Sequence, residues 1–164
     1  MDYRRLFEEK NRLTYDAGDE ERQAAMEQGI RRAVEGQENL RPRIHDMMKK
    51  SFVSCSEADR TLTLAYEVEE WELNAGGTMH GGMIAAAMDT TCGMTARYLS
   101  GSLNAATVSL TVSYLRPVPA GGRLLVTAKA VRIGRSLANL TAEAVNSRNG
   151  KTAALATAVF RIRK

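Results

Sequence analysis

Residues 74–89 read NAGGTMHGGMIAAAMD, a glycine-rich stretch that runs directly into an apolar segment and ends in an acid. The segment from Met83 to Met88 is apolar on every face of a helix, which indicates a helix surrounded by protein. Glycines at the start of a helix let another molecule approach the backbone closely, and the first N–H groups point outward at the positive end of the helix dipole. The sequence therefore predicts a buried helix over residues 81–99 whose start can bind a carbonyl oxygen or an anion.

Strand patterns lie on both sides of this helix. Apolar residues alternate with polar or small ones over residues 61–68, and Phe52-Val53 lies before that strand across a turn, which predicts a hairpin. Further strands are expected over residues 105–115, 123–133, 136–146 and 152–162, the last two joined by the turn sequence Asn149-Gly150. One buried helix followed by consecutive antiparallel strands predicts an α+β fold in which the sheet wraps around the helix.

The first fifty residues have a helical pattern without any recognisable site. Acids at residues 19–21 open a helix that closes with Arg31 and Arg32 before Gly36, and a second, short helix begins at Arg41-Pro42 and ends in Lys49-Lys50. We expect two parts, a helical N-terminal extension over residues 1–50 and the α+β domain over residues 51–164. The extension could cover a sheet edge, enlarge an interface, lie over part of a substrate tunnel or bind a partner.

Composition excludes several classes of protein. A chain of 164 residues with 44% hydrophobic and 26% charged residues can bury one core, and no apolar run approaches the ~18 residues of a membrane span. The first residues lack the apolar stretch of a signal peptide, and two cysteines, Cys55 and Cys92, are too few for a disulfide framework. We therefore expect a cytoplasmic protein with reduced thiols and no membrane association.

Charge is distributed unevenly along the chain. Eleven basic residues and a single acid, Glu143, lie between Arg97 and Lys164. This bias indicates either a phosphate-bearing partner or an ordinary solvated face of the sheet. Aromatic residues make up only 5% of the chain and do not alternate with basic ones, so we expect no nucleic-acid partner.

Asp89 is the candidate catalytic group, because a carboxylate that directly follows a buried segment is costly unless it is hydrogen-bonded or used. The simpler alternative is that it only meets Thr90, Thr91 or a backbone donor. The N–H of Gly81 and the side-chain amide of Asn74 can hold a carbonyl oxygen that is being attacked. Asp89 lies about 12 Å beyond Gly81 along the helix, too far for a general base to act there. A twofold-related second copy would bring its own Asp89 to Gly81, so we expect an active dimer with two composite sites.

Two motifs together resemble a known family. They are Asn74-x-x-Gly77-x-x-His80-Gly81-Gly82 followed by Asp89, and Ser113-Tyr114-Leu115-Arg116-Pro117. Over roughly residues 50–164 the chain resembles the hotdog-fold acyl-CoA thioesterases of the phenylacetic-acid-degradation (PaaI-like) type. The resemblance implies a sheet wrapped around one helix, homodimers that often pair into homotetramers, and hydrolysis of an acyl-CoA thioester to an acid and free CoA without metal or other cofactor.

The resemblance also implies roles for single residues. Asp89 would activate water as a general base or attack the thioester itself, while Gly81 and Asn74 hold its carbonyl. His80 would shape the loop, in a role that is as much structural as catalytic. Thr107 would orient the water, unless it is only an inward-facing strand residue. We expect further substrate contacts from four residues, the two arginines through the phosphates of CoA: Gly82, Thr90, Arg116 and Arg135.

Other functions fit the sequence less well. The histidines His45 and His80 and the two separated cysteines show no metal-ligand spacing. Cys92 lies on the buried helix with no histidine nearby in sequence, which argues against a thiol nucleophile. Hydration of an enoyl-CoA, a related activity, pairs an acid with a histidine in a different spacing. The alternative from another class is a non-hydrolytic acyl-CoA-binding or sensing module.

Overall fold

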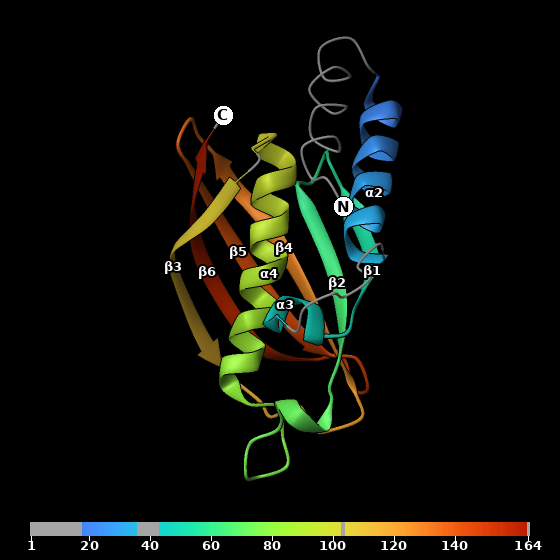
Figure 1. Cartoon of the computed structure of the whole chain (residues 1–164), viewed down its shortest axis with the longest axis vertical. Coiled ribbons are helices and arrows are strands. Elements are labelled where there is room, and N and C mark those ends of the chain that lie inside the picture. Colours follow the sequence, from blue (N-terminus) through green and yellow to red (C-terminus); the bar gives the residue numbers. More distant parts are fainter. Residues whose placement is uncertain (1–17, 36–42, 103, 164) are drawn as a thin grey trace.

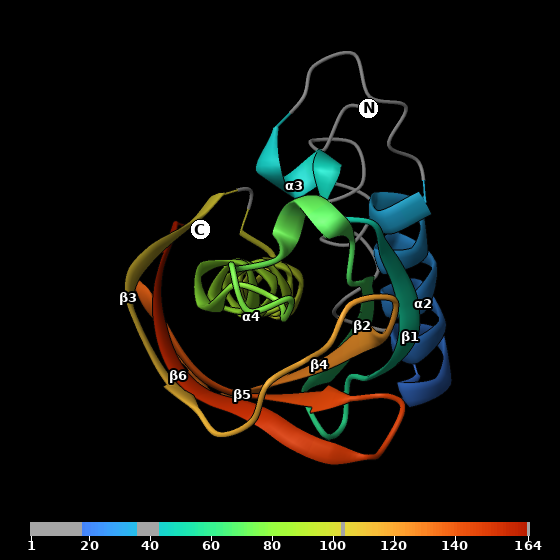
Figure 2. The ribbon, with the colours of Figure 1, turned by 90° about the horizontal axis from the view of Figure 1, so that it is seen from below.

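The computed structural model describes residues 18–35, 43–102 and 104–163. Within them, six strands form one antiparallel sheet in the order β1-β2-β4-β5-β6-β3. The sheet curls around a single long helix, α4, which lies in its concave face (Figure 1; Figure 2). The predicted α+β architecture, a sheet wrapped around one helix, is therefore confirmed.

Most element boundaries agree with the sequence prediction. The helices are α2 (Asp19–Glu35), α3 (Ile44–Met47), the 3-10 helix η1 (Glu70–Glu72) and α4 (Gly81–Ser100). The strands are β1 (Lys50–Ser56), β2 (Thr61–Glu67), β3 (Asn104–Tyr114), β4 (Arg123–Ile133), β5 (Leu137–Asn146) and β6 (Lys151–Arg163). The predicted boundary between an extension ending at residue 50 and a domain beginning at residue 51 stays a prediction.

The second short helix is the main difference. It was expected to reach Lys49-Lys50, but α3 ends at Met47 and β1 begins at Lys50. Met48 has an extended backbone and a buried side chain, so the chain leaves the helix to place this residue in the core. Arg41 and Pro42 lie outside the described residues.

Helix α4 is buried on one side and half-buried on the other. The buried side faces the sheet, and there the hydroxyl of Tyr66 on β2 donates to that of Thr91, which itself donates to the carbonyl of Ala87 (2.9 Å each). On the opposite side Met83 and Thr90 are only half-buried. The expectation of a helix surrounded by protein is thus wrong for a single copy, because the described residues cover only the sheet-facing side.

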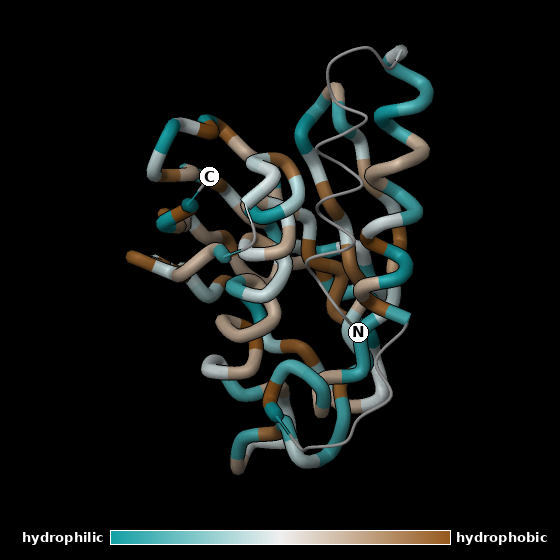
Figure 3. Tube along the Cα trace, turned by 45° about the horizontal axis from the view of Figure 1, so that its top comes forward, coloured by the Kyte–Doolittle hydropathy of each residue, from teal (hydrophilic) through white to brown (hydrophobic). Residues whose placement is uncertain are grey.

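The two edges of the sheet differ. At the β1 edge, the side chain of Gln23 on α2 donates to the carbonyl of Cys55 (2.8 Å) and accepts from the N–H of Glu57 (2.9 Å). One amide side chain thus pairs with the backbone of Cys55 at the end of β1 and of Glu57 just after it, and α2 covers this edge. Figure 3 shows α2 as largely hydrophilic turns broken by a few apolar positions, as expected for a helix with one face on the sheet. No described strand pairs with the outer edge of β3.

Two further findings bear on the predicted environment. Both thiols, Cys55 and Cys92, are free. Among the helices that the structure describes, none combines the length and apolar character needed to cross a membrane.

Candidate active site

The start of α4 leaves one backbone N–H unused. His80 is the N-cap residue: its Nδ1 accepts from the N–H of Gly82 (2.9 Å), and its carbonyl accepts from those of Met83 (2.8 Å) and Ile84 (3.1 Å). The N–H of Gly81 is the one donor of this first turn without a partner among the described residues. It points out of the helix at the positive end of the dipole, where a carbonyl oxygen gains most when it acquires negative charge.

His80 therefore has an observed structural role. Because Nδ1 accepts a hydrogen bond, the proton of the neutral ring is on Nε2, and this group is the donor that remains. The backbone N–H of His80 donates to the carbonyl of Glu72 (2.7 Å), which ties the helix start to η1. A catalytic role for the exposed ring stays a prediction.

Asn74 builds the loop before the helix. Its Oδ1 accepts from the N–H of Gly76 (2.9 Å), and its Nδ2 donates to the hydroxyl of Thr78 (3.1 Å). Gly77 has a φ of 73°, a left-handed conformation that favours glycine at this turn. In this conformation the amide of Asn74 is engaged within its own loop, and its contact with a substrate carbonyl stays a prediction.

Asp89 meets a residue from another element. Its Oδ1 accepts a hydrogen bond from the hydroxyl of Thr107 on β3, at 2.8 Å. Asp89 is half-buried and Thr107 is exposed, so this pair is open to the outside of the subunit. The simpler alternative, a bond between Asp89 and Thr90 or Thr91, is not what the structure has: Thr91 uses its hydroxyl on Ala87 and Tyr66, and Thr90 lies half-buried beside the acid.

A β-bulge places Thr107 on this side of the strand. The register of β3 against β6 shifts between Thr107 and Ser109, and beyond the bulge Tyr114 again faces the helix. Without the extra residue of the bulge, Thr107 and Tyr114, seven positions apart, would lie on opposite faces of the strand. The bulge therefore lets one strand supply two side chains to α4.

Tyr114 is a site residue that the sequence reasoning missed. Its hydroxyl donates to the carbonyl of Gly81 (2.9 Å), and a Cβ added at Gly81 would come within 3.4 Å of its ring. The motif containing Tyr114 was noticed, but within it only Arg116 was given a role. The signal is the spacing between Thr107 and Tyr114, which becomes interpretable only when the bulge is known.

The site of one copy falls into two halves. Gly81 with Tyr114 lies at the start of α4, and Asp89 with Thr107 lies eight residues further along. At ~1.5 Å per residue these halves are about 12 Å apart. Gly81 and Asp89 of the same copy therefore cannot act on the same atom.

A buried carboxyl group caps the 3-10 helix η1. Glu72 is 1% exposed; its Oε2 accepts from the N–H of Glu69 (3.0 Å), and its Oε1 has no hydrogen-bond partner among the residues that the structure describes. Burial raises the pKa of Glu72 above its usual range, and the nearby charge of Glu69 adds to this effect.

The two predicted phosphate-binding arginines lie at opposite ends of the sheet. Arg116 follows β3 and donates to the carbonyl of Thr152 (2.8 Å), at the start of β6. Arg135 is in the turn between β4 and β5, next to Ser136, whose carbonyl accepts from Ile162 at the far end of β6. Ten residues of strand correspond to about 33 Å, so one copy cannot apply both arginines to the same phosphate. Gly82, the fourth predicted contact, already uses its N–H on His80.

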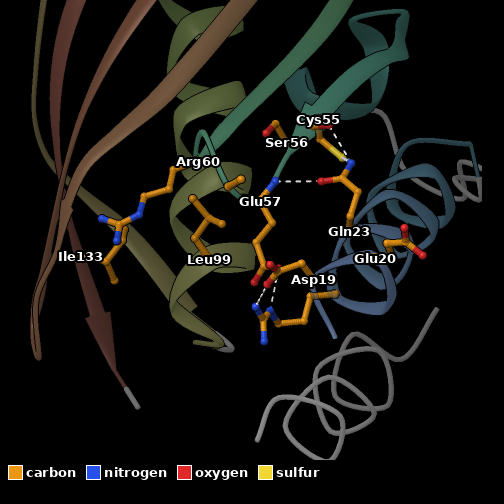
Figure 4. A pocket seen from close by; sticks show the side chains of 11 residues that line it. Asp19, Glu20, Gln23, Cys55, Ser56, Glu57, Arg60, Leu99 and Ile133 are labelled. Carbon is orange, nitrogen blue, oxygen red and sulfur yellow. Dashed lines mark hydrogen bonds and ion pairs between the residues drawn. The ribbon is translucent and has the colours of Figure 1, made fainter. Parts of the chain in front are cut away.

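A cavity of about 840 Å³ lies near the opposite end of α4, between α2 and the β1–β2 turn (Figure 4). Leu99 lines it, ten residues beyond Asp89 and hence about 15 Å further along the helix. Within its lining, Arg22 forms ion pairs with Asp19 and Glu57. This cavity is separate from both halves of the candidate site.

The chain is similar to known thioesterases. The family model described as the thioesterase superfamily matches residues 76–153, a range that contains both halves of the site. Over this range, just under half of the chain, the protein is similar to the thioesterase superfamily. Its enzymatic class is thioester hydrolase, and its fold is the hotdog fold of the PaaI type.

Individual relatives agree with this assignment. The thioesterase is 27% identical over 106 residues to mouse acyl-coenzyme A thioesterase 13, which covers 65% of this chain and 76% of that protein. Human acyl-coenzyme A thioesterase 13 is 26% identical over 127 residues, 77% of this chain and 89% of that protein. The crystal structure of zebra fish thioesterase superfamily member 2 superposes with a TM-score of 0.69 at 28% identity, covering 85% of this chain and 97% of that one. A phenylacetic acid degradation-related protein of Ralstonia eutropha gives 0.68 at 28% identity, covering 80% and 97%.

Proposed function

We propose that this thioesterase hydrolyses an acyl-CoA to a carboxylic acid and free CoA, at a site shared by two copies of the chain. The observation that carries the proposal is the division of the site: the free N–H of Gly81 lies in one half, and Asp89 with Thr107 lies in the other. The names of the relatives, acyl-coenzyme A thioesterase 13, support acyl-CoA as the substrate class.

The chemistry follows from these two halves. The thioester carbonyl accepts a hydrogen bond from the N–H of Gly81, which stabilises the oxyanion formed on attack. Asp89 has Oδ1 held by Thr107, and its second oxygen takes a proton from water as the water adds to the carbonyl carbon. The carbon–sulfur bond then breaks, and CoA leaves as the thiol once it has received that proton. In the alternative route Asp89 attacks directly and water hydrolyses the anhydride. Neither route requires a metal or a cofactor.

A homodimer is the unit that this mechanism requires. The half-buried side of α4, on which Asp89 lies, and the open edge of β3 both offer surfaces for a second copy. A twofold axis that brings Asp89 to the partner's Gly81 also brings Thr107 opposite the partner's Tyr114, with the two β3 strands antiparallel. Pairing of two dimers into a tetramer is compatible with this arrangement but contributes nothing to the site.

The same axis accounts for the two distant arginines. Arg135 lies toward the Thr107 end of β3, and Arg116 lies just beyond Tyr114. In the dimer, one site therefore receives Arg135 from the copy that supplies Asp89 and Arg116 from the copy that supplies Gly81. We propose that these guanidinium groups bind the phosphates of CoA.

The test is release of free CoA, followed with a chromogenic disulfide, across short, medium, long and aryl acyl-CoAs. We expect turnover of at least one substrate and a loss of about 10²–10⁴-fold in Asp89→Asn, which keeps the size of the side chain and its bond with Thr107. Absence of turnover by the wild-type chain with every acyl group would overturn the function. Full activity of Asp89→Asn would overturn the mechanism.

A further inference from the structure

One peptide group at the start of α4 is held at both ends by side chains. The carbonyl of Gly81 accepts from Tyr114 (2.9 Å), and the N–H of Gly82, in the same peptide plane, donates to His80 (2.9 Å). The two holding residues come from β3 and from the loop before the helix, so this peptide links three segments of the chain.

The preceding peptide group carries the free donor. Its carbonyl, that of His80, is fixed by Met83 and Ile84, and its N–H is the unused one of Gly81. Gly81 is the only residue between the two peptide planes, so its φ and ψ set the direction of the free N–H relative to the held peptide. Glycine itself contributes no side chain that would restrict those angles.

The ring of Tyr114 supplies the missing restriction. It packs beside Gly81, since an added Cβ would lie in van der Waals contact with it, 3.4 Å from two of its ring carbons. Within one copy Tyr114 is 53% exposed, so burial against its own chain does little to keep it there. The hydroxyl bond to Gly81 is the polar contact that orients the ring.

We infer that Tyr114 is a positioning residue of this thioesterase: it holds the Gly81 peptide so that the adjoining N–H points at the thioester carbonyl. The inference rests on the function proposed above and adds a residue to it. Removal of the hydroxyl lets the Gly81 backbone rotate, which weakens the hydrogen bond that grows strongest in the transition state. The loss should therefore fall on kcat, because binding of the ground-state thioester depends little on this bond.

The test compares Tyr114→Phe with a matched control, Tyr98→Phe. Tyr98 lies near the far end of the same helix, and its hydroxyl also donates to a helix carbonyl, that of Ala25 on α2. We measure kcat and KM for each variant with a short, a medium and a long acyl-CoA. For Tyr114→Phe we expect kcat to fall about tenfold, equally for all three substrates. KM should stay within about twofold of the wild-type value. For Tyr98→Phe we expect a lower Tm and an unchanged kcat.

The outcomes separate this inference from the proposed function. A wild-type chain that turns over acyl-CoA while Tyr114→Phe keeps full kcat would overturn the inference alone. A rise in KM that depends on acyl length would overturn it as well, because it would make Tyr114 a wall of the acyl pocket. A wild-type chain without turnover would overturn the proposed function and this inference together. Since Tyr114→Phe keeps the ring, and the Tm of each variant is measured beside its activity, misfolding cannot imitate the expected result.

Discussion

The hydroxyl of Thr107 donates to the carboxylate of Asp89 at 2.8 Å, joining the middle of β3 to the middle of α4. The bond fixes one oxygen of Asp89 and leaves the other for water or for the thioester. It also gives the acid a defined direction although the pair is open to the outside of one copy. Loss of the hydroxyl at position 107 should therefore reduce activity more than it reduces the stability of the fold.

Thr107→Val keeps the shape of the side chain and removes the donor. We expect kcat to fall roughly ten- to hundredfold, because a misdirected base loses most of its advantage. Thr107→Ser keeps the hydroxyl and should retain most of the activity, which makes it the matched control. Steady-state kinetics on the best acyl-CoA checks both variants, and equal activities of Val and Ser at this position would argue against the assigned role.

Mixing of two inactive variants tests the shared site. Gly81→Pro removes the free N–H yet suits the first position of a helix, and the preceding residue, His80, already has the extended backbone that proline requires (φ −61°, ψ 137°). We expect Gly81→Pro to lose about 10²–10³-fold in kcat. When it is unfolded and refolded with an equal amount of Asp89→Asn, random pairing should restore about one quarter of wild-type activity, since each mixed dimer holds one intact site.

No recovery on mixing, with both variants folded and dimeric by sedimentation, would mean that each site belongs to a single copy. A mixture of Asp89→Asn with Thr107→Val is the control. Both substitutions lie in the same half of the site, so one site of each mixed dimer carries Asp89→Asn and the other carries Thr107→Val. Neither site is intact, and mixing should give no more activity than the average of the two variants measured separately.

The expected β3–β3 contact predicts one residue on the twofold axis. In paired strands, side chains that oppose each other lie on the same face of the sheet. Leu110 and Val112, on either side of Thr111, both face inward, so Thr111 faces outward. Thr111 should thus face its own counterpart, and Thr111→Cys in a Cys55→Ser background should form a disulfide-linked dimer on mild oxidation. Thr141→Cys, exposed on the same sheet but on β5, is the control that should stay unlinked on a non-reducing gel.

The buried carboxyl of Glu72 predicts a pH-dependent effect on stability. Its pKa is raised in the folded state, so the folded chain keeps this proton at pH values where the unfolded chain has released it. The group costs no stability below about pH 4.5, its unperturbed value, and progressively more as pH rises toward the folded pKa. Glu72→Gln removes this cost, so its Tm relative to wild type should rise between pH 4 and pH 7, by about 2–4 °C for each kcal/mol relieved.

Glu70→Gln is the control for that measurement, because Glu70 lies on the same 3-10 helix with an exposed side chain. Its Tm relative to wild type should not change over the same pH range. A difference between Glu72→Gln and wild type that stays constant with pH would show that the folded chain does not retain the proton.

Much of the fold was accessible from the sequence because its signals are local. The alternation around Leu64 predicted β2, and the apolar run after Gly82 predicted α4 to within one residue at its end. Burial on both sides of α4 was overestimated, since an apolar pattern does not tell whether this chain or a second copy covers a face. The early end of α3 depends on Met48 entering the core, a contact made with distant segments.

The positions of site residues could be predicted from the sequence where they depend on spacing along one helix. They could not be predicted where they depend on a β-bulge. The separation of Gly81 and Asp89 follows from helix geometry alone. Tyr114 was missed because regular alternation places it on the face opposite to Thr107, and only the bulge between Thr107 and Ser109 puts both against α4. The engagement of Asn74 within its own loop depends on turn conformations that residue types alone do not specify.

The amide of Gln23, which occupies the hydrogen-bonding positions of β1, has a consequence for growth of the sheet. A sheet with two open edges can add copies without limit and form filaments. Here helix α2 of the same chain covers the β1 edge of the sheet. A strand from another copy can therefore pair only with β3. Pairing of two copies through β3 would occupy this open edge in both of them, so that the sheet could not grow further there.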